Sequence, residues 1–131
     1  MTTPIDPSGL PGEVTDLLLR HVESMEQTEV LLALSRKSGP VRAGEIAREL
    51  RISENNVVAA MDHFVQCNLA VRDGSSAYRF APSTPALAQA VTALDTAYNT
   101  RPVTLVKAIY ARPSTAVQSF ADAFRLRKPG A

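Results

Sequence analysis

The chain has 131 residues and a net charge of +1, with 45% hydrophobic and 5% aromatic residues. This length suits one domain and is too short for two independent hydrophobic cores. The sequence contains no Trp and a single cysteine, Cys67, which excludes an internal disulfide framework and fits a reducing compartment. It shows neither a signal-peptide pattern nor an apolar run of about 18 residues. We therefore expect a cytoplasmic protein that does not span a membrane.

The charges are unevenly distributed along the chain. Residues 1–66 hold six basic and ten acidic side chains, a net charge of −4, whereas residues 67–131 hold eight and three, a net charge of +5. Any attraction to phosphate should therefore come mainly from the second half.

The first third of the chain predicts a flexible tail over residues 1–12 and then two helices, over 13–22 and 25–37. Ser24 and Gln27 have the spacing of a capping box at the start of the second helix. Gly39 suits a left-handed cap after that helix, where the following proline prevents continuation.

Two further helices are predicted over residues 43–50 and from Ser53 to about Asn68. Ser53 is a good N-cap, and Asn68 can end its helix in the left-handed conformation. The segments LAVRD and GSSAYRF then predict two short strands around a turn at Asp73 and Gly74.

The remaining residues predict about three helices, each of which begins at a proline. Thr84 is the expected cap of the first, with Pro85 as its first helical residue. The apolar residues of this helix recur at steps of four, three and four, a narrow seam that suits packing against another helix. The seam consists of Leu87, Val91, Leu94 and Tyr98. We expect it to form a homodimer interface, and the alternative is that it folds back over the domain's own core.

The central order of helix, helix, tight turn, helix and small hairpin resembles a winged helix-turn-helix domain. Ala47 provides the small residue that this family has where its two helices cross. The matching apolar positions are Ile46, Leu50, Ile52, Val57, Met61 and Phe64. Arg51 is a departure, because the turn position it occupies is often glycine; it requires some strain there, or else a wider turn.

With added helices at both ends, the overall plan looks like that of MarR-class bacterial transcriptional regulators, whose terminal helices form the dimer. The resemblance implies a mostly α-helical chain in three parts. These are a tail over 1–12, a winged helix-turn-helix domain with a preceding helix over 13–83, and a helical extension for dimerisation or packing over 84–131.

The resemblance also implies sequence-dependent binding of double-stranded DNA in transcription regulation. The first turns of the recognition helix enter the major groove, so Ser53, Asn55 and Asn56 are expected to contact or position bases. Contacts of Lys and Arg with phosphate supply much of the affinity of such proteins. The candidates for phosphate binding are Arg48, Arg51, Arg72 and Arg79, with Arg42, Arg125, Arg127 and Lys128 as further ones.

The same helix permits an opposite interpretation, in which the domain docks on another regulatory protein. The helix that follows Ser53 contains no Lys or Arg, its charges are Glu54 and Asp62, and it exposes Val58 and Ala59. An acidic and mildly apolar face suits protein docking as well as DNA binding.

No motif indicates catalysis or cofactor binding. The glycines form no phosphate-binding loop, and no Ser, His and Asp stand at a strand-to-helix elbow. His63 and Cys67 are four residues apart on one helix, so both could be ligands of one metal ion, but the sequence offers no second pair of ligands beside them. We therefore expect a protein that is not an enzyme and uses neither a metal nor a cofactor.

Overall fold

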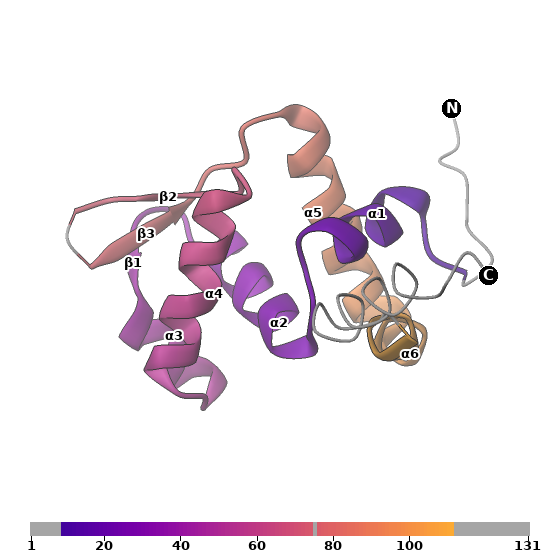
Figure 1. The fold of residues 1–131 in the computed structure, drawn as a ribbon, viewed down its shortest axis with the longest axis horizontal. Coiled ribbons are helices and arrows are strands. Elements are labelled where there is room, and N and C mark those ends of the chain that lie inside the picture. The colour runs from indigo at the N-terminus through magenta and orange to yellow at the C-terminus, as the bar shows by residue number, and fades with distance from the viewer. Residues whose placement is uncertain (1–8, 75, 112–131) are drawn as a thin grey trace, which may run out of the picture.

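The computed structural model describes residues 9–74 and 76–111, and in this part of the chain six helices and three short strands form a mostly helical fold (Figure 1). In chain order they are α1 Gly12–Arg20, α2 Met25–Ser35, β1 Val41–Arg42, α3 Ala43–Leu50, α4 Glu54–Gln66, β2 Ala70–Arg72, β3 Ala77–Phe80, α5 Pro85–Thr100 and α6 Pro102–Ala111. The predicted mostly α-helical class is confirmed. The helix expected after Pro113 lies outside the described residues.

The strands form an antiparallel sheet in the order β1-β3-β2. β2 and β3 are the predicted hairpin, and in it Val71 lies opposite Arg79. β1 was not predicted from the sequence; it adds Val41 opposite Tyr78 at the free edge of β3. Two residues are too few to show the alternation by which a strand is recognised, so only the pairing itself reveals β1.

The core runs through the whole described part of the chain, with α2 at its centre. In Figure 1 the sheet, α3 and α4 occupy one end of the molecule, and α1, α5 and α6 occupy the other. α2 contacts α3, α4 and α5, and it buries five consecutive residues, 30–34. Phe64 of α4, Leu94 of α5 and Leu105 of α6 are each fully buried in the same cluster.

The segment expected to be a loose tail contributes to this core. Leu10 is 0% exposed, and α1 already begins at Gly12. Arg101, which follows α5, donates a hydrogen bond from Nη1 to the carbonyl oxygen of Gly9 at 2.5 Å. The proline and glycine content of this segment concealed Leu10, whose burial removes a large apolar side chain from water.

Most of the predicted helix starts are confirmed. Ser24 Oγ accepts from the backbone N–H of Gln27 at 3.1 Å, while the Gln27 side chain accepts from the N–H of Glu23 at 2.7 Å. At the start of α5, Thr84 Oγ1 accepts from the N–H of Leu87 at 3.1 Å.

One of the two predicted helix ends is wrong. Asn68 has the expected left-handed conformation, with φ of 65°. A left-handed cap at Gly39 is not formed, because α2 ends earlier, at Ser35, and its cap Arg36 is right-handed. The last carbonyls of α2 are satisfied locally instead, since Ser35 Oγ donates to the oxygen of Leu32 at 2.8 Å.

Candidate nucleic-acid interface

α3 and α4 pack against each other and are joined by the three-residue turn 51–53. Arg51 has φ of 59° and ψ of 46°, the left-handed conformation, and so takes the strained alternative rather than a wider turn. The backbone N–H of Ile52 donates to the oxygen of Ala47 at 3.1 Å, as in a Schellman motif. The turn therefore fixes the angle between the two helices through the backbone.

The first turn of α4 is bare to solvent. Ser53, Glu54, Asn55 and Asn56 are all exposed, whereas the next residue, Val57, is fully buried. Ser53 Oγ caps the helix by accepting from the N–H of Asn56 at 3.5 Å. The structure thus places the three predicted base-contacting residues together on one accessible turn.

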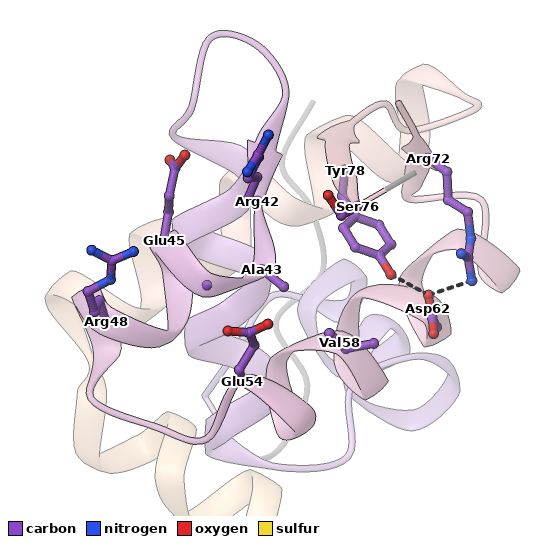
Figure 2. A pocket seen from close by; sticks show the side chains of 11 residues that line it. Arg42, Ala43, Glu45, Arg48, Glu54, Val58, Asp62, Arg72, Ser76 and Tyr78 are labelled. Atoms are coloured by element: carbon purple, nitrogen blue, oxygen red, sulfur yellow. Dashed lines mark hydrogen bonds and ion pairs between the residues drawn. The ribbon is translucent and has the colours of Figure 1, made fainter. Parts of the chain in front are cut away.

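A hollow of about 640 Å³ lies beside this turn, between α3, α4 and the β2–β3 hairpin (Figure 2). Three guanidinium groups and three carboxylates line it, so its formal charge is close to zero. The basic residues are Arg42, Arg48 and Arg72, and the acidic residues are Glu45, Glu54 and Asp62.

Arg42 and Arg48 stand on one side of the hollow, on β1 and α3, with Glu45 between them in the view of Figure 2. Among the described residues, neither of these arginines forms an ion pair, and neither does Arg51 at the turn. All three are exposed. These three guanidinium groups are therefore available to an anionic partner.

The Glu54 side chain lines the hollow and points from the first turn of α4 towards the start of α3 (Figure 2). A Cβ placed on Gly44 would be 3.1 Å from its Oε1, so glycine leaves the room that this carboxylate occupies. A negative charge beside a helix N-terminus is favourable, because the macrodipole is positive there. This position gives the carboxylate a structural role in addition to any contact with a ligand.

The two hairpin arginines predicted to bind phosphate are both engaged in ion pairs. Arg72 Nη2 lies 2.7 Å from Asp62 Oδ1, and Arg79 Nε lies 3.8 Å from Asp73 Oδ2. Arg72 faces α4 and the hollow, whereas Arg79, which does not line the hollow, belongs with Val71 on the opposite side of the hairpin. The structure therefore brings Arg72 to the site and leaves Arg79 away from it.

Asp62 is a residue whose role the sequence did not reveal. Its Oδ1 accepts hydrogen bonds from Arg72 at 2.7 Å and from the Tyr78 hydroxyl at 2.6 Å. Burial raises the pKa of Tyr78, and the hydrogen bond to Asp62 and its negative charge raise it further. Arg72 and Tyr78 are cross-strand partners, whereas a two-residue turn at Asp73 and Gly74 would place residue 75 opposite Arg72, so the predicted turn gave no signal for this pairing.

The seam predicted as a dimer interface lies largely inside the chain. Val91 and Leu94 are 2% and 0% exposed, in the part of the core where α5 packs against α1 and α2. Leu87 and Tyr98 are partly buried against the same cluster. The side chains at the centre of the seam are thus covered by this chain itself.

His63 and Cys67 lie together, with Nε2 and Sγ 3.5 Å apart. His63 Nε2 is also 2.7 Å from the carbonyl oxygen of His21, to which it can only donate. Burial raises the pKa of the Cys67 thiol, which favours its neutral form. In the described ranges no group of three His, Cys, Asp or Glu side chains is placed to hold a metal ion.

Comparison of the chain with protein-family models, curated proteins and solved structures finds no match. None of the helices in the described ranges has the length and apolar character needed to cross a membrane. The further basic candidates Arg125, Arg127 and Lys128 lie outside the described residues.

Proposed function

We propose that this chain is a winged helix-turn-helix protein that binds double-stranded DNA in a sequence-dependent way and regulates transcription. The observation that carries the proposal is the exposed first turn of α4, flanked by the side chains of Arg42, Arg48 and Arg51, which form no ion pair within residues 9–74 and 76–111. The order α2-β1-α3-α4-β2-β3, with β3 central in the sheet, supports the winged arrangement.

In this proposal the first turn of α4 enters the major groove. The amides of Asn55 and Asn56 can each make two hydrogen bonds to adenine, and the Glu54 carboxylate can accept from cytosine. Arg42, Arg48 and Arg51 hold phosphates on the side of the groove that faces α3. Three phosphate contacts correspond to a slope of about −2.7 in log K against log salt concentration for each protomer.

Such a slope is shallow for one protomer, and a homodimer of the MarR kind would double it. The seam on α5 is occupied by the chain's own core, so we place the dimer contact on α6. In the described residues α6 carries two large exposed apolar side chains, Val103 at 65% and Tyr110 at 78% exposure. A twofold arrangement presents two copies of α4 to neighbouring turns of the duplex.

The experiment begins with selection of duplexes from a random pool and continues with fluorescence anisotropy on the best binder. Asn55→Ala with Asn56→Ala should remove the preference for the selected duplex over a scrambled one and leave the salt slope unchanged. Arg48→Gln should make the slope shallower by about one, because one phosphate contact is lost. Arg20→Gln on α1 removes the same charge away from both the site and α6 and is the matched control, for which we expect no change.

A second candidate function is docking on another regulatory protein, which the three carboxylates in the hollow favour. They bring the formal charge of the hollow close to zero, and the partly buried Val58 adds an apolar contact. If the selection yields no duplex with salt-dependent binding while the folded protein is intact, the DNA proposal is wrong and this second function replaces it.

A further inference from the structure

We infer that Asp62 is a positioning residue that holds the β2–β3 hairpin against α4 and keeps the Arg72 guanidinium from reaching a phosphate. The effect on DNA affinity rests on the proposed function. The attachment of the hairpin does not depend on that function and can be measured without DNA.

The placement of Asp62 follows from helical spacing. Glu54, Val58 and Asp62 are separated by four residues each, so they lie on one stripe of α4, and all three line the hollow. At one end of this stripe Glu54 lies in the exposed first turn of α4, and at the other end Asp62 lies beside the β2–β3 hairpin. The charge of Asp62 therefore sits between the base-contacting turn and the wing.

One oxygen of Asp62 holds both strands of the hairpin. Arg72 of β2 and Tyr78 of β3 are cross-strand partners, and both donate to Oδ1, at 2.7 and 2.6 Å. The guanidinium of Arg72 also lies over the Tyr78 ring, 5.7 Å from its centre. Figure 2 shows both contacts converging on Asp62 at the edge of the hollow.

The two contacts differ in strength because they differ in exposure. Tyr78 is 5% exposed, so its bond to Asp62 is sheltered and anchors the hairpin. The side chains of Arg72 and Asp62 are 58% and 35% exposed, and ion pairs this close to solvent are weak and screened by salt. The contact of Arg72 is therefore the weaker of the two, and Asp62 stays where Tyr78 holds it and competes with phosphate for the Arg72 guanidinium.

This arrangement lowers DNA affinity in a defined way. In the free protein Arg72 is divided between its carboxylate partner and open solvent, and only the released fraction is ready for a phosphate. Replacing Asp62 by Asn removes the competing charge and keeps an oxygen that can accept from Tyr78. We expect Asp62→Asn to bind the selected duplex about fivefold more tightly, with a salt slope steeper by about one.

The test is a double-mutant cycle of Asp62→Asn with Arg72→Gln, measured by anisotropy over a range of salt concentrations. If Asp62 acts through Arg72, the gain from Asp62→Asn disappears when Arg72 is already replaced. Asp16→Asn is the matched control, because Asp16 pairs with Arg20 at 2.9 Å on α1 and its loss changes the net charge equally. An equal gain in the Arg72→Gln background, or in the control, overturns the inference.

A second readout needs no DNA. In a background where Tyr98 and Tyr110 are replaced by Phe, absorbance titration follows Tyr78 alone. Asp62→Asn should lower the pKa of Tyr78, since the negative charge beside the hydroxyl is lost, and Arg72→Gln should raise it. An unchanged pKa in Asp62→Asn shows that the contact does not form and overturns the inference, even when DNA binding is intact. If the pKa of Tyr78 shifts as expected but no variant binds DNA, the hairpin attachment is supported and only the proposed function is refuted.

Discussion

Arg51 combines backbone strain with a position beside the proposed DNA surface, so one substitution should change stability and binding in opposite directions. Its left-handed conformation, with φ of 59°, costs an L-residue roughly 1–2 kcal/mol, which glycine avoids. Glycine also makes the unfolded chain more flexible, which lowers the free energy of unfolding by about 0.4–1 kcal/mol and offsets part of this gain. We therefore expect Arg51→Gly to raise the free energy of unfolding by about 0.5–1 kcal/mol, and Tm by about 2–5 °C.

The same substitution removes a guanidinium group from the edge of the site. We expect a salt slope shallower by about one for DNA, even though the protein is more stable. Arg51→Gln separates the two effects, because it removes the charge and keeps the strained conformation. The assays are urea unfolding followed by circular dichroism and anisotropy with the selected duplex. If Arg51→Gly is no more stable than Arg51→Gln, the backbone strain assigned to this turn is refuted.

Three further predictions concern other parts of the molecule. Leu10→Ala should lower the free energy of unfolding by about 2–5 kcal/mol in urea titrations, since a fully buried side chain is truncated, and a change below 0.5 kcal/mol would place Leu10 in a loose tail. Burial lowers the pKa of His21, as do the nearby positive charges, so stability should fall as the pH drops below about 6.5, where the unfolded chain binds the proton first. Urea unfolding at pH 5 and 7 should show a smaller difference in His21→Asn, and an unchanged difference would contradict this assignment. In sedimentation velocity, Val103→Ser with Tyr110→Ser should convert a dimer to a monomer whereas Val71→Ser on the hairpin should not; a dimer that survives would exclude this face of α6.

Most helices could be predicted from local sequence patterns, because the interactions that begin and end a helix involve residues close together in the sequence. Ser24 and Thr84 cap helices through hydrogen bonds that span three residues, and Asn68 takes a backbone conformation that its own side chain tolerates. Such features depend on neighbours in the sequence, so spacing and residue type identify them. Gly39 shows the limit, since α2 ends two residues earlier than predicted and so needs no cap at Gly39.

The features that the sequence did not reveal depend on contacts between distant segments. β1 exists only because β3 offers it an edge, and Leu10 is buried only because the core of α1 and α5 lies beside it. The seam of α5 shows the same limit, because an apolar stripe does not specify whether Val91 and Leu94 pack within the chain or on a partner.

The same distinction between local patterns and distant contacts explains why only part of the candidate site was predicted. Exposure of Asn55 and Asn56 follows from the period of α4, and the structure confirms it. The pairing of Arg72 with Asp62 joins residues ten positions apart on different elements, so counting arginines along the chain overestimated those free to bind phosphate. Among the described residues Arg42, Arg48 and Arg51 form no ion pair. Arg42 lines the hollow, whereas Arg79 does not and is paired with Asp73.

The most direct test of the central claim is the salt dependence of DNA binding in the variant that combines Arg42→Gln, Arg48→Gln and Arg51→Gln. If these three side chains hold phosphates, the slope of log K against log salt concentration becomes shallower by about 2.7 for each protomer, and affinity at low salt falls with it. A slope that matches that of the native chain, in a variant with an unchanged circular dichroism spectrum, would show that DNA does not bind at this face.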